Sequence, residues 1–128
     1  MKFLSYARRM RGQTAFVYGG KALDMDLEGG LEEVLDDLID QGARRIVLTL
    51  GSMKFLHYTL FAGLLAVQRR LQELGGDLVL AEVPWFVEMR FQQLGVAHRF
   101  AMVPHAGVVE RAERLTLNLD DQDSIIPG

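Results

Sequence analysis

The chain has 128 residues, of which 49% are hydrophobic and 24% are charged, and its formal net charge is −3 at pH 7. A chain of this length and composition forms one globular domain around a single core, so neither a disordered chain nor a repeat array is expected. Because there is no basic excess to neutralise phosphates, nucleic-acid binding is not expected either. The sequence contains no cysteine, which excludes disulfides, thiolate nucleophiles and cysteine-ligated metal sites.

The sequence also predicts where the protein resides. No uninterrupted run of about 18 apolar residues is present to cross a bilayer, so membrane insertion is not expected. The amino-terminal stretch lacks the layout of a secretory signal, because its basic residues follow the short apolar pieces instead of preceding them. We therefore predict a cytoplasmic protein.

Hydrophobic patterning along the chain alternates between the spacing of strands and the spacing of helices. The predicted elements are, in order, strands over residues 2–8 and 14–18 with a turn at 11–12, a loop through residue 24, a helix over 31–39, a strand over 45–50, a helix over 59–74, a strand over 77–81, a helix over 84–94, a strand over 99–103 and a helix over 105–115. This order, ββαβαβαβα, predicts an α/β fold: a mixed sheet, made of an N-terminal antiparallel hairpin and parallel strands, with about four helices packed onto it.

Three further expectations concern the layout of the domain. The aliphatic run over residues 45–50 is typical of a central strand that is covered on both faces. The polar side of the first helix is acidic and is expected to face solvent; it carries Glu32, Glu33, Asp36, Asp37 and Asp40. We predict one domain over residues 1–118, followed by a flexible acidic tail over residues 119–128.

The loop that leaves the central strand is the best candidate for a functional site, since ligands gather at the carboxyl ends of strands in open α/β sheets. It runs from Gly51 to Thr59 and brings the Thr59 hydroxyl to the expected cap of the second helix. Unpaired N–H groups and the positive end of the helix dipole would favour a phosphate on Thr59. The alternative is that Thr59 only caps the helix, a role typically worth about 1 kcal/mol.

His57 and Tyr58 precede this threonine and could serve acid–base chemistry if a substrate pocket existed. No third partner is apparent, and no nucleotide-binding or nucleophile motif accompanies them. A surface or packing role is the alternative for His57, as it is for His98 and His105. The clustered carboxylates lack a convergent partner, so no metal and no cofactor are assigned.

Two surfaces are candidates for protein contacts. Trp85 and Met89 lie off the main apolar line of the third helix and are expected to contact another protein, whereas Phe86 is expected in the core. The exposed edge of the hairpin, residues 2–18, could pair with a second copy to give a homodimer.

Several short motifs along the chain resemble the STAS domain, the fold of the anti-sigma factor antagonists. The matching pieces are Val17-Tyr18-Gly19-Gly20 with Leu23-Asp24, the run from Gly42 to Leu48, Phe55-Leu56, the run from Leu74 to Leu80, and Leu94-Gly95-Val96 with Phe100. They spread over nearly the whole chain, from about Phe3 to Leu115. The resemblance implies a STAS-like fold.

The family typically carries Asp-Ser-Ser-Gly-Leu-Gly in the loop, and its second serine is phosphorylated by a partner kinase that is also the anti-sigma factor. Alignment on Phe55-Leu56 places His57 at the aspartate, Tyr58 at the first serine and Thr59 at the phosphoacceptor. Residues 60–62 replace Gly-Leu-Gly, and Thr49 replaces an acidic residue common near the end of the preceding strand. The hydroxyl is therefore the one feature of the family's loop that is retained.

The resemblance implies a bacterial, non-enzymatic regulatory module that binds a partner protein, such as an anti-sigma factor kinase, through residues 51–59 and the adjacent helices. In this reading Thr59 is the switch, and His57, Tyr58, Trp85 and Met89 contact the partner. A second reading keeps the fold but makes the chain a subunit of an ABC-transporter or stress-signalling complex without a phosphorylation switch. A third, from another class, is a small hydrolase or ligand sensor that uses His57 and Tyr58.

Overall fold

The structure is a computed structural model that describes residues 6–125, with side chains as far as Leu115. Its elements are β1 (Ala7–Arg11), β2 (Thr14–Tyr18), the 3-10 helix η1 (Gly20–Met25), α1 (Gly30–Asp40), β3 (Arg45–Thr49), α2 (Tyr58–Glu73), β4 (Asp77–Ala81), α3 (Trp85–Gln93), the 3-10 helix η2 (Ala97–Arg99), β5 (Ala101–Val103) and α4 (Ala106–Ile125). Across this part of the chain, no helix is long and apolar enough to cross a membrane.

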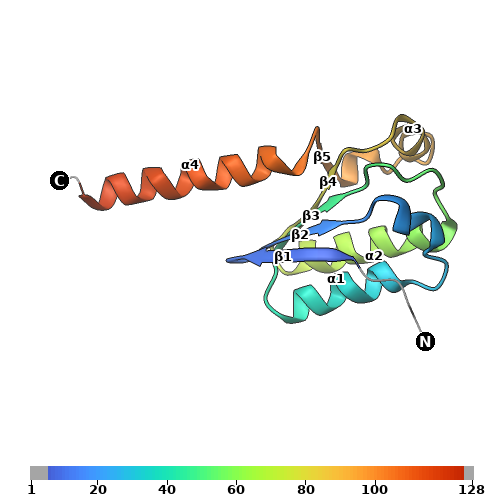
Figure 1. Cartoon of the computed structure of the whole chain (residues 1–128), viewed down its shortest axis with the longest axis horizontal. Helices are drawn as coiled ribbons and strands as arrows, with labels where there is room; N and C mark the ends of the chain where they lie inside the picture. The colour runs from blue at the N-terminus through green and yellow to red at the C-terminus, as the bar shows by residue number, and fades with distance from the viewer. Residues whose placement is uncertain (1–5, 126–128) are drawn as a thin grey trace.

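The strands form one mixed sheet whose spatial order follows the sequence, β1-β2-β3-β4-β5 (Figure 1). β1 pairs antiparallel with β2, and every later neighbour is parallel. Both the predicted hairpin and the parallel remainder of the sheet are thus confirmed. Since all the parallel strands run the same way, the loops after β2, β3 and β4 emerge at one edge of the sheet, which we call the carboxyl end.

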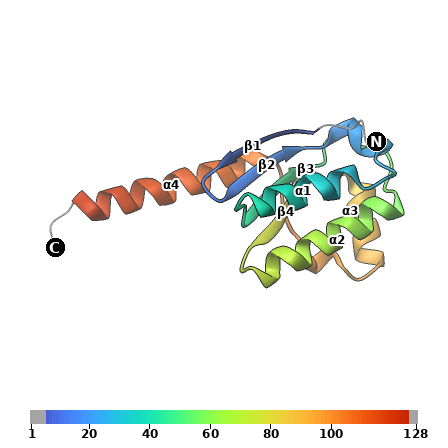
Figure 2. The same ribbon diagram turned by 90° about the horizontal axis from the view of Figure 1, so that it is seen from below.

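Helices cover the two faces of the sheet unequally (Figures 1 and 2). α1, α2 and α3 pack on one face, where the larger core forms around Leu35, Leu48, Leu64, Leu80 and Phe91. The start of α4 packs on the other face, over a smaller core of Phe16, Val47, Val79, Ala81, Ala106 and Val109. Alternate residues of β3 enter the two cores and are fully buried, as expected of a central strand.

Several element boundaries differ from those predicted. Gly12 adopts a left-handed φ of 61° in a turn formed with Gln13, so Arg11 pairs with Thr14 as the last residue of β1. The predicted strand over 2–8 overlaps β1 at residues 7 and 8, and its residues 2–5 lie outside the described part of the chain. β5 begins at Ala101 because residues 97–99 form η2.

The last helix ends ten residues later than predicted, at Ile125 instead of Leu115. Its apolar spacing weakens after Leu115, but the sequence places no glycine or proline before Pro127 to stop the helix. The division into a domain of residues 1–118 and a flexible tail of residues 119–128 stays a prediction. Residues 126–128 of that tail lie outside the structure's description.

The acidic side of α1 is not uniformly solvated: Glu32 and Asp36 are half-buried, which corrects the prediction for these two residues, whereas Asp40 is exposed as predicted. Arg70 of α2 donates to the carboxylates of Asp36 and Asp40 at 2.9 and 2.6 Å. The Glu32 side chain lies close to Gly63 of α2: a Cβ atom added to this glycine would stand 3.2 Å from a Glu32 carboxylate oxygen. α1 and α2 lie side by side on the sheet, so part of the polar side of α1 lines the boundary between them.

A buried carboxylate holds the start of α1. Asp26 is 2% exposed and accepts hydrogen bonds from the backbone N–H groups of Gly30 and Leu31, at 2.8 and 2.7 Å. The Tyr6 hydroxyl donates to the same carboxylate at 2.5 Å. Burial raises the pKa of Tyr6, and its hydrogen bond to Asp26 and the negative charge there raise that pKa further. The residue directly before α1 is Gly29, which has no side chain to accept hydrogen bonds from the first N–H groups of the helix. Asp26 accepts them instead.

We predict that Asp26→Asn lowers the free energy of unfolding by roughly 1–3 kcal/mol, because one amide group cannot accept all three hydrogen bonds and leaves a buried donor unsatisfied. Urea unfolding followed by circular dichroism measures the change. Asp37→Asn, the same substitution on the exposed side of α1, is the matched control and is expected to change the free energy by less than about 0.5 kcal/mol. Equal effects of the two substitutions would contradict the role given to Asp26.

Candidate functional site

The loop over residues 51–57 is tied to η1 by hydrogen bonds from one residue. The Asp24 carboxylate accepts from the backbone N–H groups of Lys54 and Phe55, at 2.7 and 2.9 Å. The His57 ring donates through Nε2 to the Asp24 carbonyl oxygen at 2.6 Å. On its other side the loop begins against the end of β4, where Gly51 N–H donates to the Glu82 carbonyl at 3.1 Å. Hydrogen bonds therefore hold the loop at its start, at Gly51, and at its end, at His57.

Thr59 lies in the first turn of α2, and its side chain is exposed. The residue that caps this helix is His57, which has an extended backbone and makes no side-chain cap hydrogen bond. The interpretation of Thr59 as a helix cap is therefore wrong: α2 begins at Tyr58, one residue earlier than predicted, and Thr59 already has helical geometry.

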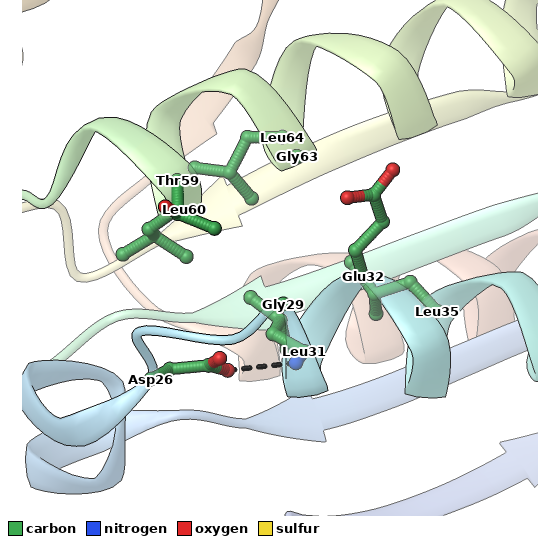
Figure 3. Close-up of a pocket in the computed structure, with 9 residues that line it drawn as sticks. All are labelled: Asp26, Gly29, Leu31, Glu32, Leu35, Thr59, Leu60, Gly63 and Leu64. Atoms are coloured by element: carbon green, nitrogen blue, oxygen red, sulfur yellow. Dashed lines mark hydrogen bonds between the residues drawn. The ribbon is translucent and has the colours of Figure 1, made fainter.

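Beside Thr59 the start of α2 faces the start of α1 across a shallow pocket (Figure 3). The pocket has a volume of about 10 Å³, which is room for about one water molecule. Its lining residues are Asp26, Gly29, Leu31, Glu32, Leu35, Thr59, Leu60, Gly63 and Leu64. Two carboxylates, those of Asp26 and Glu32, thus line the same pocket as the Thr59 side chain. The loop does not enclose a deep cavity at this position.

Large apolar side chains are exposed around this loop. Tyr58 is 83% exposed, and Trp85, at the start of α3, is 72% exposed. η1, the loop and α3 lie at the same end of the sheet (Figure 1). We define the carboxyl-end surface by its exposed apolar residues Met25, Leu27, Phe55, Tyr58, Trp85 and Met89.

α3 is fixed to α2 by aromatic contacts beneath this surface. The rings of Phe61 and Phe91 meet edge to face with centroids 5.5 Å apart, and Phe91 also packs against Phe100. Phe86 is half-buried against the core, as predicted, and its ring meets Trp85 edge to face. Trp85 and Met89 therefore point outward from a helix whose opposite side is anchored.

The structure places the predicted site residues in two neighbouring groups. His57, Tyr58 and Thr59 follow one another at the start of α2, and Trp85 and Met89 lie on α3. The His57 ring is engaged by Asp24, so its Nε2 proton braces the loop instead of facing a substrate. Tyr58 projects into solvent.

Sequence reasoning missed Met25, Leu27 and Phe55. A signal was present, because large apolar residues in a predicted loop have no core to enter and are candidates for contact with a partner. Thr49, which stands where the family has an acidic residue, ends β3 with a buried hydroxyl that lacks a hydrogen-bond partner within the described structure. Among the described side chains, no cluster of three or more histidines, aspartates and glutamates is placed to hold a metal ion.

We predict that Asp24→Ala loosens the loop without unfolding the domain, because it removes the acceptor of the Lys54 and Phe55 amides. Hydrogen exchange of those two amides should become at least about tenfold faster, which corresponds to a loss of about 1.4 kcal/mol of protection. The amides of β3 serve as the internal reference and should keep their rates. Unchanged exchange at Lys54 and Phe55 would show that Asp24 does not brace the loop.

Comparison with known proteins identifies the fold. The STAS domain family model matches residues 11–112. The unphosphorylated anti-sigma factor antagonist SpoIIAA superposes with a TM-score of 0.70 at 15% identity, covering 85% of this chain and 96% of that chain. SpoIIAA of Bacillus in its phosphorylated form gives 0.66 at 16% identity, over 84% and 99% of the two chains.

An anti-sigma-factor antagonist (STAS) domain protein from Planctomyces limnophilus gives a TM-score of 0.64 at 14% identity, over 76% of this chain and 87% of that chain. No curated protein matches the sequence. At these identities the superpositions establish the fold, and the family model, which covers well over half of the chain, establishes the membership. The protein belongs to the STAS domain family.

Proposed function

We propose that the protein is a non-enzymatic regulatory module of the anti-sigma factor antagonist type, which binds a partner protein through the carboxyl-end surface. The observation that carries this proposal is the exposure of Tyr58 and Trp85 on either side of a braced loop. Large apolar side chains exposed at one end of a small domain are candidates for an interaction site. Tyrosine and tryptophan are also the residues most enriched among those that dominate binding energy.

The hydrogen bonds of Asp24 support this proposal further. A loop that is already held in place loses little conformational freedom when a partner docks, so more of the contact energy appears as affinity. The anchoring of α3 through Phe61 and Phe91 has the same effect on Trp85 and Met89. The partner that the family resemblance favours is an anti-sigma factor kinase.

We further propose that phosphorylation of Thr59 switches this binding off. The hydroxyl is exposed in the first turn of α2, next to Tyr58. A phosphate would add nearly two negative charges beside the pocket that Asp26 and Glu32 also line. Repulsion from those carboxylates would direct the phosphate outward into the apolar surface, where its hydration opposes docking. The solved structures of SpoIIAA in unphosphorylated and phosphorylated forms support the analogy.

We predict that Tyr58→Ala and Trp85→Ala each weaken binding to the partner captured from the native cells by about thirtyfold, equivalent to about 2 kcal/mol. Isothermal titration calorimetry on the purified pair measures the effect. Leu74→Ala is the matched control, because Leu74 is an exposed apolar residue at the opposite end of α2, and it should leave the affinity unchanged. Equal affinities of all these variants would contradict the proposed surface.

We predict that incubation with the partner kinase and ATP places one phosphate on Thr59, and that this form loses at least about tenfold in affinity. Mass spectrometry maps the phosphate, and Thr59→Val, which keeps the shape of the side chain but lacks the hydroxyl, should accept none. If the Thr59→Val protein is phosphorylated as well as the natural one, the switch lies elsewhere. An unmodified Thr59 would leave a constitutive binder and contradict the switch while leaving the binding surface standing.

A further inference from the structure

The strand β4 leaves the sheet at a residue with an unusual backbone. Glu82, the first residue after β4, has a φ of 52°, and it is the one residue other than glycine with a positive φ in the described part of the chain. β2 and β3 instead turn into their loops at glycines, Gly20 with a φ of 57° and Gly51 with a φ of 58°. Glycine adopts this left-handed region freely, whereas a Cβ atom makes it unfavourable. Glu82 therefore strains the backbone where a glycine would not.

Neighbouring segments hold Glu82 in this conformation. Its backbone N–H donates to the carbonyl of Val103 at 3.3 Å, and its own carbonyl accepts from the N–H of Gly51 at 3.1 Å. Two residues later Pro84, whose ring fixes φ, precedes α3. The end of β4 is thus tied to the end of β5 on one side and to the start of the loop over residues 51–57 on the other. Strained residues persist where their surroundings determine the conformation in this way, and they cluster at functional sites.

The side chain of Glu82 gives the fold no contact in return. It is exposed, and its carboxylate forms no ion pair or hydrogen bond with any other residue that the structure describes. It does not cap α3, because the start of this helix has no side-chain cap hydrogen bond. The dipole of α3 also offers it little, since the favourable effect falls off within the first turn and Glu82 lies three residues before Trp85, where that turn begins.

Glu82 lies between the two halves of the carboxyl-end surface. Its carbonyl binds the first residue of the loop that carries Phe55, and Trp85 follows it closely at the start of α3. A partner that contacts both Tyr58 and Trp85 therefore meets the Glu82 carboxylate between them and displaces its water. A charge that loses water without gaining an opposite charge lowers affinity, so the partner needs a cation at this position.

We propose that Glu82 determines the specificity of the carboxyl-end surface by pairing with a cationic side chain of the partner within the apolar contact. The proposal rests on the proposed function, because it needs a partner that docks on that surface. Arginine is the cation enriched at interfaces, and its planar guanidinium matches a carboxylate with two parallel hydrogen bonds. A partner without such a cation would leave the Glu82 charge buried and unpaired, and is rejected for that reason.

Two substitutions separate the effect of the backbone from that of the carboxylate. Glu82→Ala removes the carboxylate and keeps the Cβ atom, whereas Glu82→Gly removes both. In urea unfolding followed by circular dichroism, the unfolding equilibrium constant of Glu82→Gly should be about fivefold smaller than those of Glu82→Ala and of the natural chain, because the relief of left-handed strain outweighs the flexibility of glycine. A Glu82→Gly protein less stable than the natural chain would show that the side chain serves the fold, and would overturn the proposal.

Calorimetry with the same purified partner protein that is titrated against Tyr58→Ala tests the carboxylate itself. Glu82→Gln, which keeps the shape of the side chain and removes its charge, should weaken binding at least about tenfold, and the more stable Glu82→Gly should weaken it as much. Glu73→Gln is the matched control, since Glu73 is an exposed glutamate at the opposite end of α2, and it should leave the affinity unchanged.

Salt gives a readout that a purely structural role of Glu82 would not change. The affinity of the natural chain should fall more steeply with NaCl concentration than that of Glu82→Gln, because salt screens the ion pair. If Tyr58→Ala weakens binding while Glu82→Gln binds like the natural chain, this proposal fails and the carboxyl-end surface stands. If neither substitution weakens binding, the surface and this proposal fail together.

Discussion

Two aspartates separated by one residue organise the carboxyl end of the sheet. Asp24 accepts the backbone N–H groups of the loop after β3, and Asp26 accepts those at the start of α1. Each supplies hydrogen bonds that the backbone there needs and that its own segment does not provide. The Asp26 carboxylate is buried, whereas Met25 and Leu27, the residues that follow Asp24 and Asp26, are exposed. The hydrogen-bonded segment over residues 24–27 thus presents apolar side chains to solvent at this end of the sheet.

The loop after β3 differs from the family's own loop, and the position of Thr59 depends on where α2 begins and on how that loop is held. Here His57, in place of the family's aspartate, holds the loop through its ring on the Asp24 carbonyl. The exposed hydroxyl of Thr59 remains at the start of α2, while Phe55 and Tyr58 make its surroundings more apolar. The chain thus presents exposed aromatic side chains at this place in the fold.

Much of the fold could be predicted from the sequence, because it rests on periodic patterns. The helix over 31–39 has one strong period and the strand over 45–50 is a nearly continuous aliphatic run, and the structure confirms both. The sequence could not show which acidic residues of α1 form ion pairs, since the pairing of Asp36 and Asp40 with Arg70 depends on how α1 and α2 lie side by side. The sequence pattern predicts a loop where η1 forms, because the contacts that stabilise η1 come from residues about thirty positions away in the sequence. The start of α2 was misplaced by one residue for the same reason.

Docking of a partner over Trp85 is the central element of the proposed function. This residue is the only tryptophan in the sequence, so a chain grown with fluorotryptophan gives a single fluorine resonance that reports on this position alone. We expect that resonance to shift on addition of the partner and to saturate at the same concentration as the heat of binding. A partner that saturates the protein in calorimetry while the Trp85 resonance stays unchanged would contradict the proposed surface.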